Sequence, residues 1–412
     1  MNPGVKQDVR QGLGRTYWTA WTAGAVSFLG TGITFGALPL LAASMTRDPR
    51  VVSLTEAVST LGWLLLGLVS GVMVDRWRRT STMWIVDAFR AVIAGAFAAL
   101  VLADLQTVPL LLLAGFVLGL FAPFFDNASS AVVPDLVAPA NLERANGYHQ
   151  VSLLMLSNLL GPPFGAFLFV VDHGLPILFD AISFAVAAAL IWKIRKAVPP
   201  PEVSEHRHLG RELVEGMKYL WRHKLLRSLC LLLVVVNAVG TGMVAILVLY
   251  VLEVLGLPEA AFGWLVAVYA VGGVAGAVIT PRLSKAFSTF TNVFTAMLIS
   301  SFAVIVMGLW GSLVPVVVAV VILGFGSAWW NVVTITLRQR IVPSALLGRV
   351  TSVYRMVAFC AAPLGAVGAG FLAHRTNLTT PYLVMGLCQL AATLAFAPTV
   401  RAQLKATLRV PV

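Results

Sequence analysis

Long runs of apolar residues, separated by short polar stretches, fill almost the whole chain. Each run is close to the roughly 20 residues that a helix needs to cross a bilayer. The pattern predicts twelve spans with the approximate bounds 17–42, 51–74, 82–103, 108–131, 150–171, 175–194, 227–251, 261–281, 290–311, 313–336, 350–373 and 381–400. A longer polar interval separates the first six spans from the last six. An even number of spans places both ends of the chain on one side of the membrane.

The composition supports this interpretation. Of the 412 residues, 59% are hydrophobic and 11% are charged, whereas soluble domains carry about 25% charged residues. The runs are much longer than the strands of a membrane barrel, so the spans are expected to be helices. We therefore predict an all-α polytopic membrane protein in which two six-helix halves, residues 1–196 and 227–412, are joined by a linker, residues 197–226.

The net charge of +12 is distributed unevenly along the chain. Most of the 29 lysines and arginines lie in the N-terminal segment, in alternate loops and after the last span, whereas the opposite loops contain only Arg47, Arg50 and Arg375. By the positive-inside rule, both termini and the linker are cytoplasmic. The positive charge thus indicates topology, and no nucleic-acid partner is expected. The first apolar run lacks a signal-peptide cleavage site, so it is interpreted as a retained span.

The linker contains an amphipathic pattern. Leu213, Met217, Leu220 and Trp221 recur at helical spacing with charged residues between them, which is typical of a helix at the membrane surface. We expect this helix to tether the two halves, and a lipid-sensing role is the alternative.

No metal site and no cofactor are expected. The histidines lie in loops or at the edges of spans, and His206 and His208 have no further ligand nearby in the sequence. Cys230, Cys360 and Cys388 fall within apolar runs and do not predict a disulfide framework. The chain also lacks a G-x-x-x-x-G-K-[ST] phosphate-binding loop. An enzyme is therefore not expected.

A charged turn lies between the second and third spans, Gly71–Thr80, with the sequence G-V-M-V-D-R-W-R-R-T. Charged side chains belong at the bilayer surface, because Asp or Arg at the centre of a spanning helix costs about 3 kcal/mol. Gly71, Asp75, Arg76 and Arg79 match the pattern Gly-x-x-x-Asp-Arg-x-x-Arg, which resembles the loop signature of the major facilitator superfamily.

Other stretches extend this resemblance over nearly the whole chain, among them D-A-F-R-A (Asp87–Ala91), F-F-D-N-A (Phe124–Ala128) and L-L-G-R-V (Leu346–Val350). Within the superfamily they resemble the branch that includes macrolide-efflux proteins and the enterobactin exporter. The resemblance implies the major facilitator fold and a bacterial inner (plasma) membrane. Two features depart from the family pattern: Thr31 stands where the branch often has an acidic or amide residue, and the fourth span lacks an arginine.

The resemblance implies a cytoplasmic latch formed by Gly71, Asp75, Arg76, Arg79 and Asp126. Asp75 would face the N-terminus of the eleventh helix, whose dipole favours an anion, and an arginine would pair with Asp126 on the fourth span. The alternative is a solvated positive-inside loop without a latch.

Three carboxylates within the spans are candidates for proton coupling, namely Glu56, Asp126 and Asp180. A buried carboxylate can take up and release a proton. For Glu56 and Asp180 the alternative is a side chain that reaches the outer interface. Asp87 and Arg90 are spaced i, i+3 and share a helix face. We interpret them mainly as a structural pair.

Glycines and prolines mark hinge and interface positions in two corresponding spans. The fifth span carries Gly161, Pro162, Pro163 and Gly165, and the eleventh carries Pro363 and Gly365. Glycines let helices approach closely and prolines bend them. Repeats with broken helices in matching places point to a transporter whose site lies between the halves near mid-bilayer.

Polar and aromatic residues inside spans are candidates for the cavity wall, since such walls suit an amphiphilic ligand. They are Trp21, Thr31, Thr34, Trp63, Phe125, Asn158, Asn237, Thr241, Trp264, Trp330, Asn331 and Gln389. Helix–helix packing is the alternative role for each of them.

Together these features predict a monomeric secondary exporter of amphiphilic small molecules, such as drugs, siderophores or other natural products, driven by proton antiport through alternating access. Its expected partners are the lipid bilayer, the substrate and protons. The alternatives are a facilitator or importer of a small metabolite, or a membrane scaffold that transports nothing.

Overall fold

The computed structural model describes residues 12–196, 198 and 209–407, and this part of the chain consists of helices and turns without a strand. The helices before the linker are α2 (Gly14–Met45), α3 (Pro49–Arg76), α4 (Arg79–Leu102), α5 (Val108–Ala131), α6 (Val133–Leu136), η1 (Pro139–Asn141), α7 (Leu142–Ser152), η2 (Leu153–Leu160), α8 (Gly161–Val171) and α9 (Leu175–Ile194). The later helices are α10 (Leu209–Arg222), α11 (Lys224–Leu249), η3 (Tyr250–Val254), α12 (Ala260–Ala286), α13 (Thr289–Leu309), α14 (Leu313–Ile341), α15 (Ser344–Phe359), α16 (Ala362–Arg375) and α17 (Thr380–Thr407).

Within the described residues, eleven helical segments are long and apolar enough to cross a membrane, with lengths from 20 to 33 residues. At 1.5 Å per residue, even the shortest extends over about 30 Å. Helix α3, with 28 residues, is also long and brings the number of long helical segments in the described residues to twelve. The predicted all-α membrane fold is therefore confirmed. Several helices continue past the predicted apolar runs into polar segments, as α14 does by extending to Ile341.

Contacts divide the chain into two units. The first unit comprises Met1–Met45 and Val58–Glu205, and the second comprises Thr46–Ala57 and His206–Val412. Helix α3 is thus shared between them, with its first residues in the second unit. The predicted boundaries at residues 196 and 227 stay a prediction, because residues 199–208 lie outside the described part of the chain.

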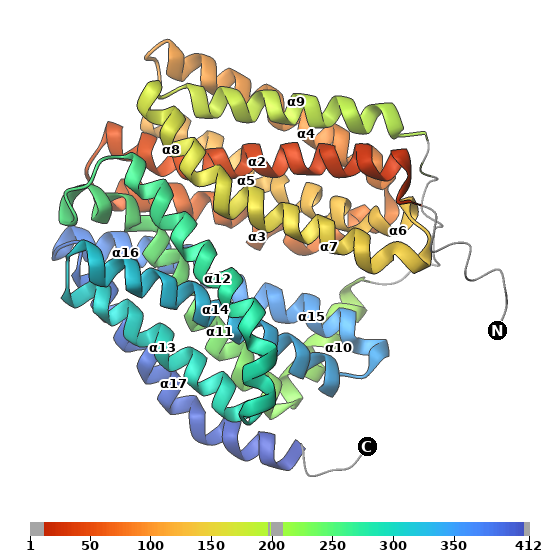
Figure 1. The fold of residues 1–412 in the computed structure, drawn as a ribbon, viewed down its shortest axis with the longest axis vertical. Coiled ribbons are helices and arrows are strands. Elements are labelled where there is room, and N and C mark those ends of the chain that lie inside the picture. The colour runs from red at the N-terminus through yellow and green to blue at the C-terminus, as the bar shows by residue number, and fades with distance from the viewer. Residues whose placement is uncertain (1–11, 197, 199–208, 408–412) are drawn as a thin grey trace. The chain divides into compact units, whose positions relative to one another are not determined.

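In the first unit, α4 packs along α9, and α2 packs against α9 and α8; Figure 1 shows α2, α4 and α9 lying side by side. Small residues allow α4 and α9 to approach: a methyl group at Gly95 on α4 would lie 3.8 Å from Cβ of Ala181 on α9. Large apolar side chains, among them Phe28, Met83 and Phe125, form the main core of this unit.

Prolines interrupt two of the spans. Pro162 and Pro163 cannot donate the backbone hydrogen bonds of a regular helix, and their rings crowd the carbonyls four residues earlier. The chain passes there from the π-helix η2 into α8. Pro363 follows a corresponding break between α15 and α16.

The hinge glycines are points of close helix contact within each unit. A methyl group at Gly165 on α8 would overlap the backbone carbonyl of Ile33 on α2, and one at Gly161 would lie 2.6 Å from Cα of Gly32. In the second unit, a methyl group at Gly365 on α16 would overlap the carbonyl of Ala238 on α11. Their role as hinges stays a prediction.

The second unit is built from α11 to α17, with α12 packed on α14, α13 on α14 and α17, and α11 on α16. Its largest core cluster includes Met297, Trp329 and Trp330. The linker helix α10 belongs to this unit, and its apolar face, with Leu213, Met217 and Leu220, packs against a cluster on α15 and α11. This face therefore contacts protein, where the sequence had suggested the membrane surface.

Candidate functional site

A cluster of charged side chains lies inside the first unit. Asp87 on α4 is completely buried and Arg90, one turn further on, is 4% exposed. The two side chains form an ion pair of 3.5 Å between Nη1 and Oδ1, longer than the 2.7–2.9 Å of a direct charge-assisted hydrogen bond. The Ser27 hydroxyl on α2 lies beside Asp87, but its geometry does not make a hydrogen bond, and within the described chain none reaches either oxygen.

Helix α9 contributes a second carboxylate. Asp180 is 1% exposed and accepts a hydrogen bond of 2.5 Å from the Thr34 hydroxyl on α2. The Ser183 hydroxyl donates to the Asp180 carbonyl at 2.8 Å and lies 3.4 Å from its Oδ1. Asp180 is therefore buried among helices with polar groups around it, and its role in proton coupling stays a prediction.

Arg90 joins the three helices. Its guanidinium lies 3.9 Å from the centre of the Phe184 ring on α9 and donates to the Thr31 hydroxyl on α2 at 3.3 Å. Asp180 is near enough to interact electrostatically with Arg90. A planar guanidinium can stack on an aromatic ring and still donate in its plane, which a lysine cannot do.

Gly30 is the residue that lets α2 reach this cluster. A methyl group there would lie 2.5 Å from Oδ1 of Asp180 and would overlap the Ser183 hydroxyl. Because Gly30 has no side chain, Thr31 and Thr34 come within hydrogen-bonding distance of α4 and α9.

The Gly71–Thr80 turn forms polar contacts in the same unit. Arg79 donates to both carboxylate oxygens of Asp135 on α6, at 2.7 Å each. Arg78 donates to the carbonyl of Val198 at 3.1 Å. The expected partner on the fourth span was Asp126, whereas the partner that the structure gives to Arg79 is Asp135. Asp126 lies half-buried on α5, and the latch stays a prediction.

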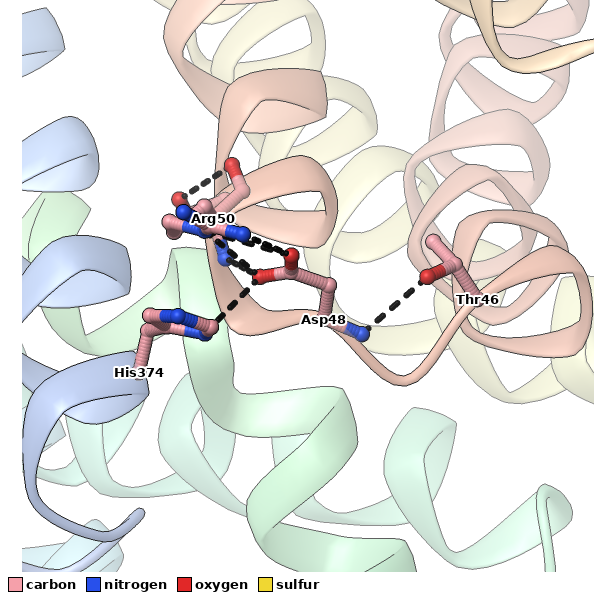
Figure 2. Close-up of polar contacts among 5 residues, drawn as sticks. Thr46, Asp48, Arg50 and His374 are labelled. Atoms are coloured by element: carbon pink, nitrogen blue, oxygen red, sulfur yellow. Dashed lines mark hydrogen bonds and ion pairs between the residues drawn. The ribbon is translucent and has the colours of Figure 1, made fainter.

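A second polar cluster joins the loop after α2 to α16, both within the second unit (Figure 2). Asp48 precedes α3 and accepts the backbone N–H of Arg50 at 2.9 Å, as a helix N-cap does. The Arg50 guanidinium donates to Asp48 at 2.7 Å, and Nδ1 of His374 lies 3.5 Å from Oδ1 of Asp48. The hydrogen bond from the Arg50 side chain lowers the pKa of Asp48 to about 2 from an ordinary value of 3.8.

The structure distributes the proposed cavity residues over different environments. Thr31 and Thr34 belong to the charge cluster. Trp21 and Asn237 donate to the backbone carbonyls of Tyr148 and Ala358. The others are buried (Phe125, Trp330, Gln389), half-buried (Trp63, Thr241) or exposed (Asn158, Trp264, Asn331). Burial in helix contacts favours a packing role for Phe125, Trp330 and Gln389. Contact of any of the twelve proposed cavity residues with substrate stays a prediction.

A small pocket opens in the first unit between α2, α5 and α7. Its lining includes the aromatic rings of Tyr17, Trp21 and Phe28 together with His149 and Ser129. The Phe28 and His149 rings meet edge to face with centroids 5.5 Å apart. Among the described residues, no group of three or more His, Cys, Asp or Glu side chains converges as metal ligands.

Sequence reasoning found part of this arrangement. It paired Asp87 with Arg90 and named Asp180, Thr31 and Thr34, but it did not bring them together. It missed Asp135 and the contact between Asp48 and His374. A proline at position 134 and a proline directly after Asp48 mark both missed aspartates as residues of tight turns, where a carboxylate meets neighbouring helices.

Comparison with known proteins adds the family context. The chain matches the Major Facilitator Superfamily over residues 20–357 and, in a second match, over 230–410. It is 25% identical over 387 residues to the multidrug efflux pump Tap of Mycolicibacterium fortuitum, covering 90% of this chain and 91% of that protein. It is 27% identical over 361 residues to the enterobactin exporter EntS of Shigella boydii serotype 4 (strain Sb227), covering 84% of this chain and 83% of EntS.

Solved structures agree on the fold. A bacterial homologue of the iron transporter ferroportin in an inward-facing state superposes with a TM-score of 0.73 at 17% identity, covering 96% of this chain and all of that one. The nucleoside transporter NupG gives a TM-score of 0.73 at 12% identity, covering 92% of this chain and 99% of NupG. At these identities the likeness concerns the fold alone.

Proposed function

Because the chain belongs to the major facilitator superfamily, we propose that it is a secondary active exporter of amphiphilic small molecules, such as drugs or siderophores, driven by inward proton flow. The observation that carries this proposal is the end-to-end similarity to two exporters, which extends over 90% of this chain for Tap and 84% for EntS. The aligned regions extend over most of the chain and are not confined to one motif.

The small share of charged residues in the chain fits such a substrate. Only 11% of the residues are charged, and the proposed cavity residues are aromatic or uncharged polar groups. Walls of this kind bind the apolar body of an amphiphile and orient it through a few hydrogen bonds.

The driving force is adequate. One charge moved through 100 mV yields about 2.3 kcal/mol, and one pH unit adds about 1.4 kcal/mol. Together these sustain a gradient of several hundred-fold per proton for an uncharged substrate, whereas exchange of one proton for a monovalent cation is driven by the pH gradient alone. Glu56, Asp126 and Asp180 are the proposed proton carriers from sequence; Glu56 and Asp126 are half-buried and Asp180 is fully buried. We propose further that both termini are cytoplasmic and that the transporter acts as a monomer.

Transport assays in everted inner-membrane vesicles test the proposal. Vesicles containing the protein, acid inside, should accumulate ethidium, an amphiphilic cation, and release it when a protonophore collapses the pH gradient. Vesicles without the protein are the control. Movement of ethidium only down its own gradient indicates a facilitator, and an absence of protein-dependent movement for ethidium and for a catecholate siderophore indicates a scaffold. Either result contradicts the proposal.

A further inference from the structure

The charge cluster of α2, α4 and α9 contains two carboxylates and one cation. Asp87, Asp180 and Arg90 are each at most 4% exposed. Asp87 is eight residues into α4 and Asp180 five residues into α9, so at 1.5 Å per residue they lie about 12 Å and 8 Å from those helix starts. The cluster is thus inside the spans and not at a helix end.

Its charge balance points to a bound proton. With both carboxylates ionised, the three side chains carry a net charge of −1 in an apolar interior. Burying an uncompensated charge is expensive, and buried groups avoid that cost by pairing or by becoming neutral. One proton shared by the two carboxylates makes the group neutral.

The hydrogen bonds show where that proton belongs. The Asp180 carboxylate accepts from Thr34, and hydrogen bonds to an ionised carboxylate stabilise its charge. Asp87 receives no hydrogen bond in the described chain, and its ion pair with Arg90 is long at 3.5 Å. In this conformation Asp180 is suited to hold the negative charge and Asp87 to hold the proton.

We propose that Asp87 and Asp180 share a single exchangeable proton, that Arg90 tightens its ion pair with Asp87 when that carboxylate loses the proton, and that this cluster is the coupling site of the exporter. The inference rests on the proposed function. When the proton leaves Asp87, the guanidinium moves closer to that carboxylate and loosens its hold on Thr31. Arg90 rests on the Phe184 ring throughout, and the flat stacking surface permits such sliding.

Helix α2 is the element that passes the change on. Thr34 binds one carboxylate and Thr31 binds the guanidinium, so a shift of the proton alters both contacts of α2 with the cluster. The same helix carries Trp21, which lines the small pocket. The protonation state thereby acts on a helix that is expected to line the substrate path.

The experiment compares Asp87→Asn, Asp180→Asn, Glu56→Gln and the control Asp172→Asn in proteoliposomes. Asp172 is exposed and its side chain accepts the N–H of Gly174 at 2.7 Å, an acceptor role that asparagine keeps. Ethidium uptake driven by a pH gradient and ethidium counterflow exchange are measured for each. Asp87→Asn and Asp180→Asn should each lower gradient-driven accumulation by about tenfold or more, as expected for the loss of one pH unit of driving force, and retain counterflow. Asp172→Asn should match the wild type.

The inference is overturned if Asp87→Asn and Asp180→Asn both keep full gradient-driven accumulation of ethidium. It is also overturned if, of the variants compared, only Glu56→Gln loses that accumulation. A wild type that shows no gradient-driven accumulation instead contradicts the proposed function. If the asparagine variants do not elute as monodisperse protein, Arg90→Lys and Asp87→Glu replace them. Arg90→Lys should lose gradient-driven accumulation, because it abolishes the stacked geometry, and Asp87→Glu should regain part of it. Wild-type behaviour of Arg90→Lys overturns the inference.

Discussion

Arg90 shows how one residue collects groups that lie far apart in the sequence. It contacts Thr31, Asp87 and Phe184, which come from three different helices. The pairing with Asp87 could be predicted from the i, i+3 spacing alone. The contact of Arg90 with α9 could not be predicted. Helix periodicity specifies which face a residue lies on, but not which other helix covers that face.

Thr34 offers a test at this scale. Thr34→Val removes the 2.5 Å hydrogen bond to Asp180 and leaves a buried carboxylate with one donor fewer, so unfolding should become easier by about 1–3 kcal/mol. Thermal unfolding in detergent, followed with a thiol-reactive dye, measures the change.

Two matched variants accompany it. Thr34→Ser keeps the hydroxyl and should stay near the wild type. Thr336→Val removes only a bond from an exposed hydroxyl to the Val332 carbonyl, and its effect should lie within about 0.5 kcal/mol. Equal unfolding temperatures for Thr34→Val and Thr336→Val contradict the importance of the Asp180 contact.

At the scale of elements, the start of α3 shows which contacts can be predicted from the sequence and which cannot. Asp48 caps α3, and Pro49 occupies the first helical position, as is common for proline. This capping could be predicted from the sequence. The approach of His374, at the other end of the chain, depends on how α16 packs against the first turn of α3, where Gly370 lies against Pro49 and Ser53.

The Asp48 cluster gives a pH dependence with a definite sign. The pKa of Asp48 is lowered to about 2 in the folded protein from 3.8, so the folded state favours the ionised carboxylate. Its contribution to stability is complete above about pH 4 and is lost as the pH falls towards 2. Asp48→Asn should therefore lower the unfolding temperature at pH 7, and its difference from the wild type should shrink below pH 4. A difference that grows on acidification contradicts this assignment.

The glycine contacts of α16 allow a sharp comparison. Gly365→Ala places a methyl group on the backbone of Ala238, whereas Gly368→Ala, on the same helix, meets nothing within 4 Å. We expect Gly365→Ala to destabilise the protein by about 1–3 kcal/mol through overpacking. Gly368→Ala should be neutral or stabilising by about 1 kcal/mol, because alanine favours the helix. The unfolding temperatures of the two variants measure this difference. Equal stability of Gly365→Ala and Gly368→Ala contradicts the close contact of Gly365 with the Ala238 backbone.

At the scale of the whole molecule, hydropathy predicts most of the architecture. The apolar runs located the long helices because membrane spans need continuous apolar stretches of known length. They did not reveal that α10 packs on α15, since an amphipathic face looks the same in sequence whether lipid or protein covers it. The direction in which the helices cross the membrane rests on charge alone.

Cysteine labelling tests that direction. With Cys230, Cys360 and Cys388 replaced, a cysteine at Thr376 or Asp104 should react with an impermeant maleimide added to intact cells. One at the exposed Phe287, in the loop between α12 and α13, should react only after the membrane is opened. The reverse pattern overturns the cytoplasmic placement of the termini.

Gly165 and Gly365 also bear on how this sequence can change over evolutionary time. Each meets a backbone carbonyl of the neighbouring helix and not a side chain, so the contact survives almost any replacement of the residues around it. Only a replacement of the glycine itself disrupts it. Such a fold leaves wide freedom for sequence drift at most lipid-facing and cavity-facing positions while holding a few glycines fixed. A comprehensive mutational scan should therefore find much stronger intolerance at these two glycines than at Ile33 and Ala238, whose backbones they touch.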